Sequence, residues 1–92
     1  IVLAQLQARQ GQHTEAQENA ATAVELEPRN PVVLEGAIEV AHRTSSLDHA
    51  VAYLRKALEL QPNDRRLCLL LAKDLSQLGQ HEEAMALSAA VT

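Results

Sequence analysis

The chain has 92 residues, which is enough for one small domain, and it carries a mild net charge of −4. Lys and Arg are not clustered as a nucleic-acid-binding surface requires, and the longest apolar run, residues 67–72, is far shorter than the roughly 20 residues of a membrane-spanning helix. We therefore expect no nucleic-acid binding and no membrane insertion in this segment, and the single cysteine, Cys68, excludes an intrachain disulfide.

The composition favours helices throughout. Ala, Leu, Gln, Glu and Arg are good helix formers, and Tyr53 is the only aromatic residue in a chain without Phe or Trp. A core without large rings must come from many close contacts, which suits helices that pack side by side through Ala. The composition therefore predicts an all-α fold.

Residues 1–30 predict two helices and a turn. Leu3 and Ala4 belong to the first helix, and Gly11 marks the turn that follows it. Ala16 belongs to the second helix. Pro28 ends that helix, because the residue before a proline is pushed out of the α region.

Residues 31–64 repeat this layout. Asn30 can cap a helix that has Pro31 in its first turn, and apolar residues then recur at helical spacing as far as Ala41. The polar residues 43–46 interrupt the pattern. A second helix follows with Ala50 on its apolar side, and Pro62 ends it.

Residues 65–92 predict a third pair of helices. Asp64 or Asn63 caps the first of them, which carries apolar residues from Leu67 to Leu75, and Gly79 suits a left-handed helix end. The second runs to the end of the sequence. Four of its residues share one face at helical spacing: Ala84, Leu87, Ser88 and Val91.

The sequence repeats with a period of 34 residues. Pro28 and Pro62 are separated by this step, and the segments that contain them match, AVELEPRN at 23–30 and ALELQPND at 57–64. A fixed period of this length indicates a helical repeat protein. The same step relates three further rows of residues: Gly11, Ser45 and Gly79; Ala16, Ala50 and Ala84; and Ala4, Ile38 and Ala72.

These rows resemble the tetratricopeptide repeat (TPR), a 34-residue helix–turn–helix unit, and the resemblance covers the whole chain. No unit has the family's Trp or Phe, Ile38 stands where a small residue is usual, and Ser45 replaces the turn glycine. In the middle unit the residues that match the family pattern are Leu34, Ala37, Ile38, Ala41, Ala50, Leu54, Ala57 and Pro62.

The resemblance implies a right-handed superhelical α-solenoid of antiparallel helix pairs. We expect one array over residues 1–92, with units at about 1–30, 31–64 and 65–92, of which the first and the last are incomplete. Because the sequence begins with Ile1 rather than Met, we expect it to be part of a longer protein. Cytoplasmic and periplasmic locations both stay open.

The resemblance also implies a function. In TPR proteins the first helix of each unit lines a concave groove, so we expect a protein–protein interaction or scaffolding module that binds a protein or peptide partner. The alternative is a structural spacer or assembly domain in a larger protein, for example in bacterial secretion, export or regulation, with no ligand of its own in this segment. By position, the groove residues are Gln5, Arg9, Glu35, Glu39, His42, Arg43, Arg66, Leu69, Lys73 and Gln77.

The charges of the groove suggest a type of partner. Arg43, Arg66 and Lys73 are the basic groups of the last two units on this surface, so a partner that crosses them should carry acidic residues. The Lys-Asn-Asn-Lys-Arg clamp with which some TPR co-chaperones grip a C-terminal carboxylate is absent, since only Arg66 is basic among the five matching positions. The apolar ends of the array predict end-to-end self-association.

The sequence offers little for catalysis, and we predict no enzyme, no metal site and no cofactor. Cys68 lies on the apolar face of a helix, where a packing role fits better than a reactive thiol. His13 and His81 occupy equivalent positions after a turn, which favours a structural role. His42 and His49 flank the middle turn, but neither a third ligand nor a nucleophile accompanies them at a recognisable spacing.

Overall fold

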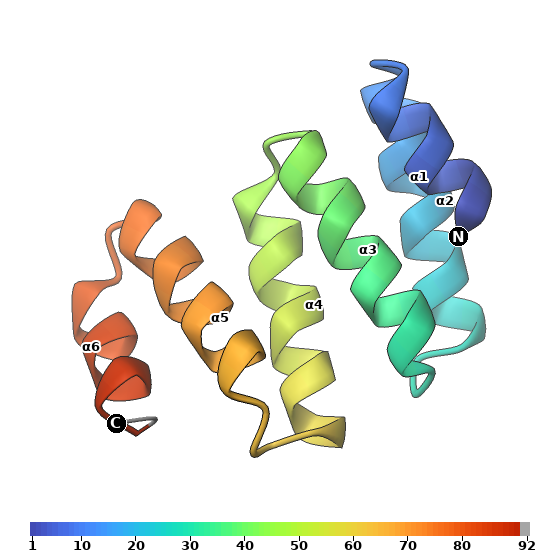
Figure 1. Ribbon diagram of the computed structural model, residues 1–92. Coiled ribbons are helices and arrows are strands. Elements are labelled where there is room, and N and C mark those ends of the chain that lie inside the picture. Colours follow the sequence, from blue (N-terminus) through green and yellow to red (C-terminus); the bar gives the residue numbers. More distant parts are fainter. Residues whose placement is uncertain (91–92) are drawn as a thin grey trace.

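The computed structural model describes residues 1–90, and in this range the chain forms six α-helices (Figure 1). Consecutive helices pair as antiparallel hairpins, α1 with α2, α3 with α4 and α5 with α6. The predicted all-α solenoid of helix pairs is confirmed. No helix in residues 1–90 is both long enough and apolar enough to cross a membrane. The helix bounds are α1 Val2–Arg9, α2 His13–Leu26, α3 Pro31–Arg43, α4 Leu47–Leu60, α5 Arg65–Gln77 and α6 His81–Ala90.

Side-chain caps start the first helices of the second and third pairs. The Asn30 side-chain oxygen accepts hydrogen bonds from the backbone N–H groups of Val32 at 3.0 Å and Val33 at 3.5 Å. The Asp64 carboxylate accepts one from the N–H of Leu67 at 3.2 Å. These bonds satisfy donors that have no partner within the helix, so both caps fix where α3 and α5 begin.

The three turns inside the helix pairs share one backbone geometry. Gly11 and Gly79 have φ angles of 81° and 86°, and Ser45 at the equivalent position has a φ of 57°. After each of them a backbone N–H reaches back five residues to a helix carbonyl, as in a Schellman motif. These bonds are Gln12 to Gln7 at 2.9 Å, Ser46 to Ala41 at 2.8 Å and Gln80 to Leu75 at 2.8 Å.

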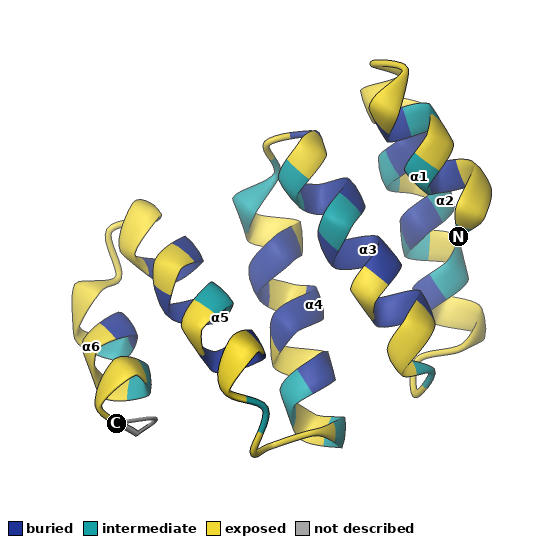
Figure 2. Cartoon of the chain, viewed as in Figure 1, coloured by how far each residue is buried: buried dark blue, intermediate teal, exposed yellow. Residues whose placement is uncertain are grey.

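Alanine occupies a repeated position in the core. Ala16, Ala50 and Ala84 recur at one position of the second helix in each pair and are 0–6% exposed. Around them lie the fully buried Leu34 and Leu54, and the buried stripe runs along the middle of the stack on α3 and α4 (Figure 2). The small residues let neighbouring helices approach, and the leucines fill the remaining volume.

The three pairs stack differently at their two junctions. Helix α3 packs on both α1 and α2, so it fits into the notch between the two helices of the first pair. Helix α5 packs on α4, and its backbone does not approach that of α3 in the same way (Figure 1). Below, α1, α3 and α5 are called the A helices; the first junction joins α1 to α3, and the second joins α3 to α5.

The close packing around Ala50 can be tested by overfilling it. Ala50→Leu adds volume at a residue that is 0% exposed, so we expect it to lower the free energy of unfolding by about 1–3 kcal/mol. Ala52→Leu, at an exposed position of the same helix, is the matched control and should change stability by less than about 0.5 kcal/mol. Urea denaturation followed by circular dichroism measures both. Equal midpoints for the two variants would contradict the packing described.

A second stability test concerns the middle turn. An L-residue in the left-handed region is strained by roughly 1–2 kcal/mol, and glycine avoids that strain. Ser45→Gly should therefore raise the free energy of unfolding by about 0.5–1 kcal/mol after the larger backbone entropy of glycine is subtracted. Ser46, with a φ of −103°, gives the control: Ser46→Gly should not stabilise the chain. The same denaturation experiment distinguishes the two positions.

Candidate functional site

The sequence-predicted groove residues all lie on the A helices. Below, the surface that they form is called the A-helix face. Gln5 and Arg9 come from α1, four residues from α3 and four from α5. The structure brings four of them together in two pairs across the junctions, Arg9 with Glu39 and Glu35 with Arg66. The pairs differ between the junctions, and these differences decide where a ligand could be held.

A glycine closes the first junction. At Gly36 of α3 a Cβ atom would lie 2.5 Å from Cγ1 of Ile1 and 3.2 Å from Nε2 of Gln5, so these two side chains pack directly on the glycine and would have to shift for any larger residue. Above it, Arg9 donates to Glu39 across the junction, with 3.3 Å between Nη2 and Oε2. Arg43 donates to the same Oε2 from one turn along α3, at 3.4 Å.

At the second junction the place of this glycine is taken by a leucine. Leu70 is 34 residues after Gly36, and its half-buried side chain lies where α5 faces α3. The side chain fills the space that the first junction closes, so α3 and α5 stay farther apart. A cavity of about 410 Å³ lies between them, within the range of ligand pockets. Its lining consists of Glu35, Ile38, Glu39, His42, Arg43, Arg66, Leu67 and Leu70.

Two polar pairs cross the second junction. Arg66 donates to Glu35, with 2.9 Å between Nη2 and Oε1, and both side chains are more than half exposed. His42 and Asp74 form a hydrogen bond of 2.6 Å between Nε2 and Oδ2. The Asp74 side chain is only 3% exposed, so the imidazole replaces solvent for a buried carboxylate. The two pairs link α3 to α5 on either side of the apolar floor of the cavity, which consists of Ile38, Leu67 and Leu70.

A second cavity, of about 480 Å³, continues along the same junction. It shares His42 and Leu70 with the first cavity, and it adds Lys73 and Gln77 from the predicted groove. Nine of the ten predicted residues therefore lie either in one cleft between α3 and α5 or in the closed contact between α1 and α3. The cleft is the candidate site.

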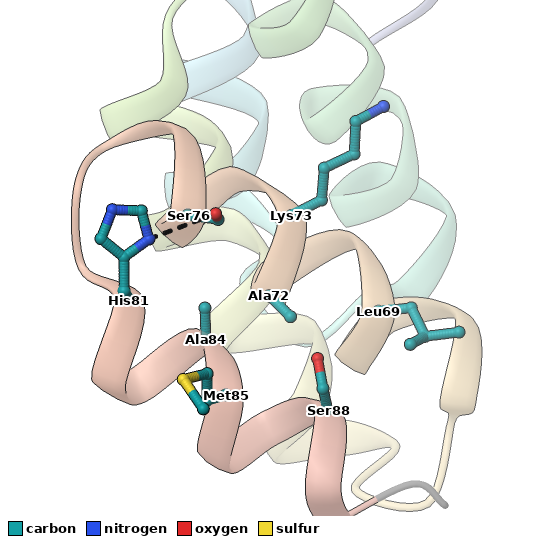
Figure 3. A pocket seen from close by; sticks show the side chains of 8 residues that line it. All are labelled: Leu69, Ala72, Lys73, Ser76, His81, Ala84, Met85 and Ser88. Atoms are coloured by element: carbon teal, nitrogen blue, oxygen red, sulfur yellow. Dashed lines mark hydrogen bonds between the residues drawn. The ribbon is translucent and has the colours of Figure 1, made fainter.

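Leu69 does not join this cleft. It lines a third cavity, of about 560 Å³, on the outer side of α5 and α6 (Figure 3). In that view the Lys73 side chain extends away from His81 and Met85, which lie on the α6 side of the cavity. Met85 is 72% exposed, whereas Val51 at the equivalent position of the second pair is 9% exposed and covered by the next helices. The third cavity therefore corresponds to a stacking surface. Val91, predicted to share this surface, lies outside the described residues.

The remaining residues considered for chemistry are dispersed. Cys68 is buried and free, while His13 and His81 are exposed, with Nδ1 of His81 3.5 Å from the Ser76 hydroxyl. Nδ1 of His49 hydrogen-bonds the Ser46 hydroxyl at 2.6 Å, whereas His42 bonds Asp74. Within residues 1–90, no group of three or more His, Cys, Asp or Glu side chains is placed to hold a metal ion.

An ion pair also links two of the second helices of the pairs, α4 and α6. Nη1 and Nη2 of Arg55 contact the Glu83 carboxylate, at 2.7 and 3.0 Å, and link α4 to α6. The hydrogen bond from Arg55 lowers the pKa of Glu83 below its usual value and raises the pKa of Arg55. Burial, and then the Glu25 carboxylate, raise the pKa of Tyr53, which stacks on His49 with ring centres 6.2 Å apart.

Comparison with known families agrees with this architecture. A family model described as tetratricopeptide repeat matches residues 1–30 and 39–64, which is more than half of the chain. The chain belongs to the tetratricopeptide repeat family. No curated protein matches it. Helices α5 and α6 lie outside the matched residues, and the structure places them in the same stack as the first two TPR units.

The sequence interpretation missed two residues of the TPR cleft. Asp74 was passed over, although it interrupts a row in which the equivalent residues, Leu6 and Val40, are apolar. A lone acid at a position that is otherwise apolar signals a buried polar contact, and its partner is His42. Leu70 was not predicted, because the effect on helix spacing of a large residue at the position equivalent to Gly36 depends on how close the helices come. A sequence pattern does not give that distance.

The His42–Asp74 contact predicts a pattern of rescue. His42→Ala should lower the free energy of unfolding by about 1–3 kcal/mol, because it leaves the buried Asp74 carboxylate without its partner. Adding Asp74→Val, the residue found at the equivalent position 40, should recover most of the loss. His13→Ala, at an exposed histidine, is the control. Denaturation midpoints of the variants test this, and additive losses in the double variant would contradict it.

Proposed function

We propose that the A-helix face of this TPR array binds a protein or peptide partner in the cleft between α3 and α5. The observation that carries the proposal is the wide second junction, where an apolar floor, a charged rim and about 410 Å³ of space occur together. TPR repeats are in general protein–protein interaction modules. A preformed cleft on rigid helices also loses little conformational entropy on binding.

The alternative, a spacer without a ligand in this segment, is favoured by one observation. Much of the charge on the A-helix face is neutralised internally, by the Arg9–Glu39–Arg43 group and by the Glu35–Arg66 pair. A surface that satisfies its own charges offers less to a partner. The two functions differ in whether the cleft selects any peptide.

The proposal is tested by selecting peptides from a random display library on the immobilised chain. Labelled chain is then titrated with the selected peptides, and amide chemical shifts are recorded by NMR. Shifts should concentrate on the residues that line the cleft, such as Ile38, Leu67 and Leu70. Shifts on α2, α4 and α6 instead would remove the cleft from consideration. Enrichment no greater than on the bare support would favour the spacer.

A further inference from the structure

The two junctions of the array differ in charge at equivalent positions. At the first junction Arg9 on α1 meets Glu39 on α3, with 3.3 Å between their charged atoms. Adding the 34-residue period to each gives Arg43 on α3 and Lys73 on α5. An attractive pair at the first junction is thus replaced by two cations at the second.

The structure shows how the chain accommodates these cations. Arg43 turns back along its own helix to Glu39, at 3.4 Å, and so shares that carboxylate with Arg9. Lys73 is exposed and forms no ion pair with any residue from 1 to 90. The Glu39 carboxylate therefore pairs with two arginines. At the equivalent position of the second junction, Lys73 carries an ammonium group that no described carboxylate neutralises.

An apolar pocket adjoins these cations. Arg43 lies on the rim of the cavity that is floored by Ile38, Leu67 and Leu70. Lys73 lines the second cavity, which shares Leu70 with the first. Glu35 and His42 form the two polar pairs that cross the junction, and they are about 10 Å apart along α3 at 1.5 Å per residue. An extended peptide of about three residues has the same length.

We propose that the cleft recognises an acidic peptide segment of a protein partner. A carboxylate of the segment bridges Arg43 and Lys73, as Glu39 bridges Arg9 and Arg43, and a neighbouring large apolar side chain enters the pocket over Leu70. The inference rests on the proposed function, since it names the class of partner for the same cleft. The carboxylate would supply at the second junction the anion that the repeat itself supplies at the first.

The distribution of charge supports an acidic partner. The residues that form the A-helix face include four of the eight basic residues of the chain, Arg9, Arg43, Arg66 and Lys73, but only two of its twelve acidic residues, Glu35 and Glu39. The face is therefore positive on a chain whose net charge is −4. The glutamates among these cations disfavour a continuous phosphate backbone, whereas a short peptide can place one carboxylate at Arg43, about two helical turns along α3 from Glu35.

The test compares short synthetic peptides with blocked ends, measured by fluorescence anisotropy on the intact chain. The reference peptide has one Leu flanked by Glu. One variant replaces each Glu by Lys, a second replaces the Leu by Ala, and a poly-dT oligonucleotide is the nucleic-acid probe. The reference peptide should bind at least about tenfold more tightly than either variant, because each lacks one of the two contacts. Its affinity should fall as salt is added.

The decisive variant is Lys73→Glu. It restores at the second junction the Arg–Glu arrangement of the first, so the thermal midpoint should stay unchanged or rise while affinity for the reference peptide falls about tenfold. Lys56→Glu, on exposed Lys56 of α4, makes the same change of charge away from the cleft and should leave the affinity within about twofold. Equal losses in the two variants would show a non-specific charge effect and overturn the inference.

Leu70→Gln, which keeps the size of the side chain between α3 and α5 but makes it polar, tests the apolar contact separately. It should abolish the difference between the Leu and Ala peptides while the preference for Glu over Lys persists. If the library selection yields peptides that shift the cleft amides but shows no preference for acidic residues, this inference fails and the proposed function stands. If no peptide shifts the cleft amides, both fail. Tighter binding of poly-dT than of the reference peptide would assign the surface to nucleic acid instead.

Discussion

The spacing between neighbouring A helices depends on the size of the side chain that each A helix directs toward the preceding one. Gly36 lets α1 and α3 close on each other, and Leu70 at the equivalent position keeps α3 and α5 apart. The two cavities at the second junction and the access to their apolar residues go with this difference. A repeat array of regular sequence thus acquires one irregular junction, and that junction holds the two cavities between α3 and α5.

The core tolerates the absence of Phe and Trp because small and aliphatic side chains fill it. Ala16, Ala50 and Ala84 are buried on the second helices, where small side chains allow close packing, and Leu34 and Leu54 fill the centre with aliphatic volume. Ile38, which departs from the family pattern, is also buried, and it contributes to the cleft floor. The larger residue therefore fills space that a smaller one would have left open beside the wide junction.

Local features were predictable from the sequence because each depends on one or two residues. The caps at Asn30 and Asp64 and the left-handed turn at Gly79 require only a side chain of the right type at the right position. The helix pairs followed from the 34-residue period. Spacing between helices was not predictable, because it depends on two side chains that meet across a junction. Hence the groove residues were assigned to the correct helices, while Leu69 was grouped with a cleft that it does not line.

The sharing of Glu39 between two arginines bears on how the cleft could exchange partners. If an incoming carboxylate draws Arg43 toward Lys73, Glu39 keeps Arg9 and is not left unpaired. The exchange therefore leaves no orphaned charge on the A-helix face, whereas opening the Glu35–Arg66 pair would expose two. Since these groups are exposed and each contact is weak, the difference in cost is modest. It nevertheless favours the Arg43 side of the cleft as the place where a charged ligand is exchanged.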